Sequence, residues 1–183
     1  MPELFYLAIT SVDGYVEDAR GKFDWAAPDV VVHSFINDLM EPVGTYLYGR
    51  RMYETMLAWE TITEGEHHIQ EFARIWRAAD KVVFSRSLTS VSSERTRIEK
   101  EFRPDLIRSW VAASSGGAGI GGAELASAAL ASQLVDEYHL LIAPYVAGGG
   151  KRALPEQIQL RLELTDEKRF PSGMVYLRYR IGY

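Results

Sequence analysis

Three short segments of the chain combine glycine, hydroxyl and guanidinium groups, and each directly follows a short apolar run. They are Gly49-Arg50-Arg51, Ser85-Arg86-Ser87 and Gly121-Gly122-Ala123-Glu124. An arginine side chain can donate two parallel hydrogen bonds to a phosphate, and glycine lets a ligand approach the backbone closely. Together these residue types indicate a site for a phosphorylated ligand.

The third segment has the composition of a pyrophosphate site. An apolar run ends at Ile120, two glycines follow, and a helical pattern begins at Glu124. The free N–H groups and the positive dipole end of a helix N-terminus attract anions. Glycines that only pack a helix closely against a strand are the alternative, and the segment lacks the G-x-G-x-x-G spacing of the dinucleotide fingerprint. The pyrophosphate-binding candidates are Gly121, Gly122, Ala123, Glu124 and Leu125.

Two arginine clusters predict an additional phosphate on the same ligand. Gly49, Arg50 and Arg51 follow one apolar run, and Ser85 and Arg86 follow another. Exposed arginines are ordinarily solvated surface, but two clusters beside a pyrophosphate turn suit a dinucleotide that carries an extra phosphate. We therefore predict NADPH, rather than NADH, as the cofactor.

Strands that alternate with helices must position these segments. Apolar and branched runs predict strands, and residues with helical spacing predict helices between them. The chain then ends in two strands joined by a Pro-Ser-Gly turn, which predicts an antiparallel hairpin. This order indicates an α/β fold with a mixed sheet, in which ligands bind beyond the carboxyl ends of the strands. The expected strands are 4–10, 45–48, 81–84, 97–99, 118–120, 136–146, 160–170 and 174–181, and the expected helices are 29–40, 51–57, 67–79, 104–111 and 124–132.

The composition excludes several classes of protein. The 183 residues, 47% of them hydrophobic, fit one domain over 1–183. A net charge of -5 argues against a general nucleic-acid binder, and the absence of cysteine excludes disulfides and thiolate metal sites. The four histidines lack metal-ligand spacing, so no metal is expected. With no signal peptide or membrane-spanning run in evidence, we predict a cytoplasmic protein with no membrane partner.

The order of these motifs resembles the dihydrofolate reductase-like superfamily across nearly the whole chain. Four segments are similar to dihydrofolate reductases: 46–54, 81–86, 120–124 and 136–144. Ser11-Val12-Asp13-Gly14-Tyr15 and the segment 144–150 look closer to the reductase domain of the bifunctional riboflavin-biosynthesis deaminase-reductase. The best resemblance is to small stand-alone proteins similar to that domain.

The resemblance implies a three-layer fold with a mixed, mostly parallel sheet of about eight strands, NADPH bound across the strand ends, and frequent homodimers. By the same resemblance, Arg50 would face the adenosine 2′-phosphate with Ser85 and Arg86, and the glycine pair would hold the pyrophosphate. The residues implied on the nicotinamide side are Ala8, Ile9 and Val16. One departure is Met52, which stands where dihydrofolate reductases commonly have a phosphate-binding threonine.

Four residues are candidates for the reacting centre. Asp29 begins the helix that matches the substrate-side helix of dihydrofolate reductases and is the catalytic candidate; capping of that helix is its alternative role. The substrate-binding candidates are Asp13, Trp25 and His33. Asp13 can instead serve only its turn, and Trp25 can instead fill core.

These observations favour an NADPH-dependent reductase that transfers hydride to a small planar heterocycle of the pterin or pyrimidine type, or to a carbonyl compound. One alternative is a non-catalytic nucleotide-binding or sensor protein that retains the fold, because fold does not dictate function. A flavin-binding oxidoreductase is a further alternative. The expected partners are a small-molecule substrate and a second copy of the chain.

Overall fold

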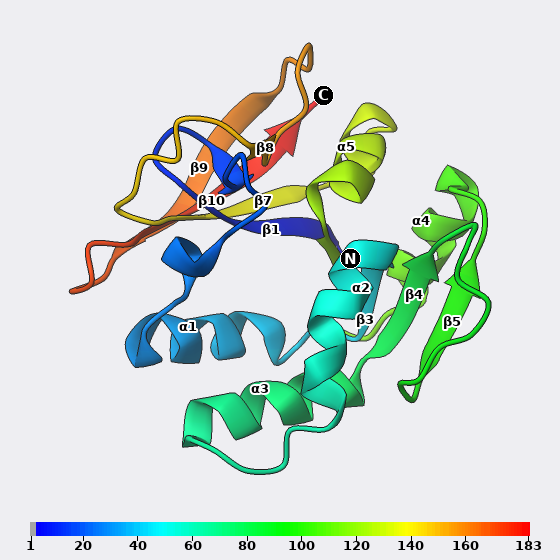
Figure 1. Ribbon diagram of the computed structural model, residues 1–183. Helices are drawn as coiled ribbons and strands as arrows, with labels where there is room; N and C mark the ends of the chain where they lie inside the picture. The colour runs from blue at the N-terminus through cyan, green and yellow to red at the C-terminus, as the bar shows by residue number, and fades with distance from the viewer. Residues whose placement is uncertain (1–2) are drawn as a thin grey trace.

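The computed structural model describes residues 3–183. Its centre is an eight-stranded mixed sheet (Figure 1). Six strands are parallel, and the C-terminal strand β10 runs antiparallel to both of its neighbours. The predicted mixed sheet with a C-terminal antiparallel hairpin is therefore confirmed. In spatial order the strands are β5 (Thr96–Glu99), β4 (Asp80–Phe84), β3 (Thr45–Gly49), β6 (Ala118–Gly121), β1 (Leu4–Thr10), β7 (Glu137–Ile142), β10 (Val175–Gly182) and β9 (Arg161–Arg169).

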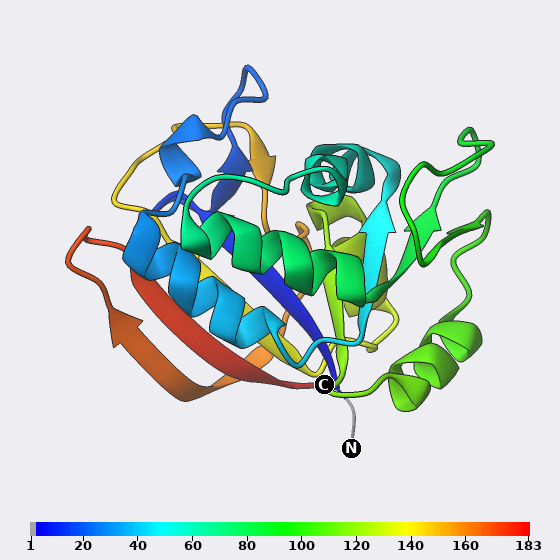
Figure 2. The ribbon, with the colours of Figure 1, turned by 90° about the horizontal axis from the view of Figure 1, so that it is seen from below.

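Helices cover both faces of this sheet and make the molecule three layers thick (Figures 1 and 2). One face carries α1 (Val30–Met40), α2 (Arg50–Met56) and α3 (His67–Ala78), and the other carries α4 (Pro104–Ala113) and α5 (Ala123–Ala131). Two short 3-10 helices, η1 (Asp24–Ala26) and η2 (Leu57–Glu60), lie in the connections. Within residues 3–183, no helix has the length and apolar character needed to cross a membrane.

Strand β1 shows why this sequence forms a sheet that is covered on both sides. Side chains alternate along a strand, so Phe5 packs into the core under α1 and α3, whereas Leu4 and Tyr6 pack into the core under α4 and α5. Both sets are apolar because both faces are buried.

The structure corrects the sequence prediction between Ser11 and Arg152. The predicted strand 136–146 ends at Ile142, because the chain leaves the sheet at Ala143 and the following Pro144 has no N–H to donate to a neighbouring strand. A second, two-stranded sheet of β2 (Tyr15–Glu17) and β8 (Lys151–Arg152) was not predicted. These strands have three and two residues, which is too short to give a periodic pattern.

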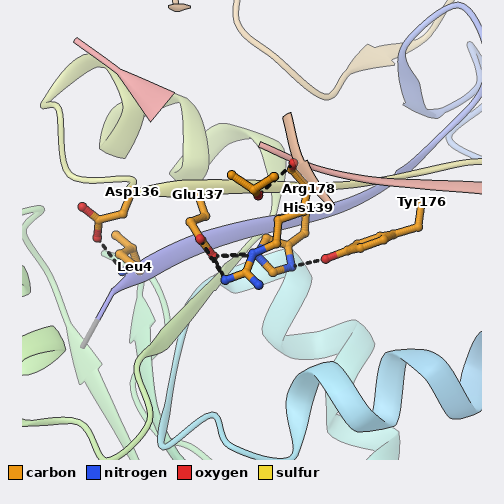
Figure 3. Close-up of polar contacts among 7 residues, drawn as sticks. Leu4, Asp136, Glu137, His139, Tyr176 and Arg178 are labelled. Carbon is orange, nitrogen blue, oxygen red and sulfur yellow. Dashed lines mark hydrogen bonds and ion pairs between the residues drawn. The ribbon is translucent and has the colours of Figure 1, made fainter. Parts of the chain in front are cut away.

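A buried polar network fastens β10 to β7 (Figure 3). The Tyr176 hydroxyl lies 3.0 Å from His139 Nδ1, and His139 Nε2 lies 3.1 Å from Glu137 Oε2. The Arg178 guanidinium donates to both oxygens of Glu137, at 2.7 to 3.0 Å. Hydrogen bonds from Arg178 and His139 outweigh the burial of the Glu137 carboxyl and hold its pKa below the usual range. Beside this network, Asp136 accepts the Leu4 N–H at 2.8 Å, so the amino ends of β1 and β7 are also joined.

Candidate functional site

The sheet order brings the three predicted segments together at the carboxyl end of the parallel strands. β4, β3 and β6 are consecutive neighbours, with Gly49 opposite Phe84 and Tyr48 opposite Gly121. Neighbouring strands lie roughly 4.8 Å apart, so the segments that follow them lie side by side. The groups that follow these strands therefore lie at the same end of the sheet.

The arginine side of the site is held by serine hydroxyls. Arg50 Nη1 donates to the Ser87 hydroxyl at 3.3 Å, which links the end of β3 to the end of β4. The buried Ser85 hydroxyl accepts the N–H groups of Ser87 (3.3 Å) and Leu88 (3.0 Å), and this fixes the turn that carries Arg86. Arg50 also lies 3.6 Å from Glu54, and about half of its side chain stays exposed. Its guanidinium can therefore bind an anion without leaving a buried partner.

The glycine side of the site requires glycine for steric reasons. A Cβ on Gly121 would lie 2.8 Å from the Tyr48 ring and 3.1 Å from Met52 Cγ. Gly122 has a φ of +94°, which side chains with a Cβ rarely adopt. Gly122 is also the N-cap of α5 and provides no side-chain cap, so the first amides of this helix stay available. Met52, in the first turn of α2, lies next to both glycines, so the starts of α2 and α5 are neighbours.

Lys151 is a cation of this site that sequence reasoning missed. Its ammonium group lies 2.9 Å from Glu124 Oε1 and 3.6 Å from Glu17 Oε1. The hydrogen bond from Lys151 lowers the pKa of Glu124, with a smaller contribution from the charge of Arg51. An open hollow of about 400 Å³ lies here, between the start of α5 and β8. The only sequence signal was its position directly after three glycines.

Two predicted substrate residues each contact the loop that follows β7. Asp13 accepts the N–H groups of Ala147 (2.9 Å) and Gly148 (2.7 Å), so it ties the turn after β1 to the loop after β7. A hydrogen bond from the Ser11 hydroxyl, followed by these amides, lowers the pKa of Asp13 to about 2. In the same place the Trp25 and Tyr145 rings are stacked, with centroids 5.1 Å apart.

The other two predicted residues have separate surroundings. Asp29 is the N-cap of α1 and accepts the Val32 N–H at 2.9 Å. His33 packs between α1 and α3, with its ring centroid 4.9 Å from that of His68 and 5.7 Å from that of Phe72. Burial, and then the neighbouring His68, lower the pKa of His33. The structure therefore places the His33 ring in the interface between α1 and α3.

The three residues expected on the nicotinamide side divide between the two faces of the sheet. Ala8 and Val16 pack toward the α5 face, whereas Ile9 packs toward the α1 face. Successive residues of a strand cannot present side chains to the same ring, so Ala8 and Ile9 could both contact it only through the backbone. Among residues 3–183, no group of three acidic or histidine side chains is arranged to hold a metal.

Comparison with known proteins yields one family match and one curated relative. The RibD C-terminal domain family matches residues 120–176, which run from the glycine pair to the hairpin. The Bacillus subtilis (strain 168) protein named "Uncharacterized protein YyaP" is 28% identical over 179 residues, covering 94% of this chain and 91% of YyaP. The likeness to YyaP thus extends over almost the full length of both chains.

Solved structures share the fold at low sequence identity. A candidate riboflavin biosynthesis protein from Shewanella sp. PV-4 superposes with a TM-score of 0.77 at 22% identity, over 99% of both chains. The Thermotoga maritima diaminohydroxyphosphoribosylaminopyrimidine deaminase/5-amino-6-(5-phosphoribosylamino)uracil reductase gives 0.69 at 14% identity, over 99% of this chain and 57% of that one. Enterococcus faecalis dihydrofolate reductase, complexed with NADP(H), gives 0.61 at 11% identity, over 99% and 97%. The predicted resemblance is confirmed: this chain has the dihydrofolate reductase-like fold and, in residues 120–176, the features of the RibD C-terminal domain.

Proposed function

We propose that the protein is an NADPH-dependent reductase of a small planar heterocycle or carbonyl compound. The observation that carries this proposal is the convergence of Arg50, Ser85 and Gly122 on one end of the sheet. The match to the RibD C-terminal domain and the shared fold of reductases support a reductase-type function. NADPH would supply a hydride to the substrate carbon, while a proton from water would complete the addition of two electrons and two hydrogens.

The residues of the site suit the two ends of this cofactor. Arg50 and Arg86 would bind the 2′-phosphate, with Arg51 beside them, because exposed guanidinium groups lose little when they exchange water for phosphate. The amides of Ala123, Glu124 and Leu125 would receive the pyrophosphate, because the N-cap Gly122 has no side chain to occupy them. Ala8, Ile9 and Val16 would then lie near the nicotinamide, beside the end of β1.

Titration with NADPH and NADH, followed by nicotinamide fluorescence, tests the proposal. Arg50→Ala should weaken NADPH binding about tenfold to a hundredfold, the worth of charged hydrogen bonds of roughly 1.5–3 kcal/mol. Binding of NADH, which has no 2′-phosphate, should not change. The matched control is Arg74→Ala, which removes an exposed arginine that pairs with Glu41 instead. Failure of the wild-type protein to bind either dinucleotide would refute the proposal.

A non-catalytic nucleotide-binding protein is the second candidate, and one observation favours it. The carboxylates of Asp13 and Asp29 both accept backbone N–H groups, so each already has a structural role. If Asp29 is catalytic, Asp29→Asn should abolish turnover while NADPH binding persists. Tight NADPH binding without oxidation by any pterin, pyrimidine or carbonyl compound would instead favour the second candidate.

The proposal includes a homodimer in the cytoplasm. The edge strand β9 is exposed along its length, and its Leu162 and Leu164 are large exposed apolar residues that a second copy would cover. Light scattering of the purified protein, together with a Leu162→Ser, Leu164→Ser double variant, tests the dimer. A wild-type mass of one chain, 20.6 kDa, would contradict it.

A further inference from the structure

The carboxyl end of the sheet has two halves with different surfaces. The strands β4, β3 and β6 end in arginines and glycines, whereas β1 and β7, which follow in the sheet, end beside an exposed apolar surface. We call this surface the apolar rim, and it consists of Val12, Phe23, Trp25, Tyr145 and Val146.

Contacts join three residues of the apolar rim. The Val12 N–H donates to the Tyr145 carbonyl at 2.8 Å, and the Trp25 ring is stacked on the Tyr145 ring with an interplanar angle of 12°. Val12, Phe23, Tyr145 and Val146 are nevertheless 42% to 65% exposed. A group of large apolar side chains that stays in water is a common mark of a binding surface. A planar molecule could extend the Trp25–Tyr145 stack.

Carboxylates outnumber cations around the apolar rim. Asp13, Asp24 and Asp29 lie on the loops that form it, and Asp13 keeps its charge because its pKa is about 2. Two cations, Arg20 and Lys22, belong to the loop before η1, and the Lys22 carbonyl accepts the Trp25 indole N–H at 3.2 Å. Their backbone amides donate to Asp18, whose pKa their charges also help to lower. In Figure 2 this blue loop projects from the body of the molecule.

The remaining nearby cations have other partners. Lys151 is paired with Glu124 and Glu17, and Arg152 lies over the Tyr15 ring at 5.1 Å. Lys168 lies over the Phe35 ring at 4.7 Å, on β9, which is three strands away from β1. A phosphate on the substrate would thus meet more acidic than basic groups at the apolar rim.

We propose that the apolar rim binds the substrate, and that this substrate is an uncharged planar compound without a phosphate group. The proposal rests on the proposed function, because it assigns the substrate half of the same site. It separates this chain from a reductase of phosphoribosyl compounds, the activity in the name of the Thermotoga maritima neighbour.

Calorimetric titration of three probes tests the inference, with the free protein and with the protein saturated with NADP⁺. The probes are 5-amino-6-(5-phosphoribosylamino)uracil, the same compound without its phosphate, and 9,10-phenanthrenequinone, an uncharged planar dicarbonyl. We expect the phosphate-free compound to bind at least tenfold more tightly than its phosphate ester, and the quinone to bind more tightly still. Equal or tighter binding of the phosphate ester, or no binding of the quinone, would overturn the inference.

Variants locate the binding surface. Trp25→Ala should weaken quinone binding at least tenfold and leave the NADPH dissociation constant unchanged, whereas Trp25→Phe should restore most of the quinone affinity. Tyr183→Ala, which removes an exposed aromatic ring that donates to the Val135 carbonyl, is the matched control and should have no effect. Unchanged quinone affinity in Trp25→Ala would also refute the inference. Because NADPH binding and the effect of Arg50→Ala are measured on the same preparations, failure of the rim and failure of the cofactor site give different results.

Discussion

The two ends of the parallel strands use the same kinds of side chain in opposite ways. Toward the amino end, the Arg178 guanidinium makes three hydrogen bonds to a buried Glu137. At the carboxyl end, Arg50 makes one long hydrogen bond to Ser87 and stays half-exposed. Arg178 is thereby committed to holding β10 against β7, whereas Arg50, which also lies 3.6 Å from Glu54, keeps exposed donors that a ligand could use. The hydrogen-bond partners of an arginine therefore indicate its role better than its mere presence does.

The largest expected effect is at the amino end. Arg178→Ala leaves the buried Glu137 carboxylate without its guanidinium partner, so the free energy of unfolding should fall by about 3 kcal/mol. Urea denaturation measures this fall. Arg50→Ala is the control from the carboxyl end and should change the unfolding free energy by less than about 0.5 kcal/mol. Equal losses in the two variants would erase the distinction between the two ends.

A smaller effect is expected from adding one methyl group to the glycine side. Gly121→Ala places a Cβ against the buried Tyr48 ring and should cost about 1–3 kcal/mol of stability by overpacking. Gly49→Ala, also at the carboxyl end of a strand, meets nothing within 4 Å and should be neutral. Thermal denaturation of both variants tests this pair. A stable Gly121→Ala protein would show that Tyr48 and Met52 can move aside.

Asp29 allows a sharper test within the carboxyl end. Asp29→Ala removes the cap of α1 and should cost about 1 kcal/mol, whereas Asp29→Asn keeps a capping side chain and should cost little. Comparison of the two unfolding curves measures the cap. Were both variants equally unstable, the charge of Asp29, rather than its capping hydrogen bond, would be the stabilising element.

The smallest expected effect is a pH dependence from the amino end. Burial lowers the pKa of His139, so the folded protein keeps this imidazole neutral at a pH where the unfolded chain already takes up a proton. Stability should therefore decrease as the pH falls below about 6.5, the ordinary histidine pKa. His139→Gln should reduce the slope of unfolding free energy against pH between 7 and 5.5. His33→Gln provides the comparison, because burial lowers the pKa of His33 as well.

Local sequence patterns were sufficient for most of the fold but not for the partners within the site. The apolar run of β3 and the glycines before α5 mark element ends directly, because backbone geometry limits which residues fit there. Lys151 could not be assigned, since its partner Glu124 lies 27 residues away and depends on the pairing of β2 with β8. The Glu137–Arg178 pair, 41 residues apart, likewise depends on strand register. The α3 neighbours of His33 could not be predicted either, because helical spacing alone does not tell which neighbouring helix a ring meets.

The Asp13 carboxylate has a consequence for motion at the substrate half. Asp13 accepts hydrogen bonds from Ala147 and Gly148, which lie 134 and 135 positions further along the chain. Because its pKa is about 2, the carboxylate stays charged and keeps these hydrogen bonds in mildly acidic solution. The turn after β1 and the loop after β7 should consequently shift as one body when a molecule arrives. Any rearrangement that opens the apolar rim must therefore move the end of β1 together with the loop after β7, or break the hydrogen bonds of Asp13.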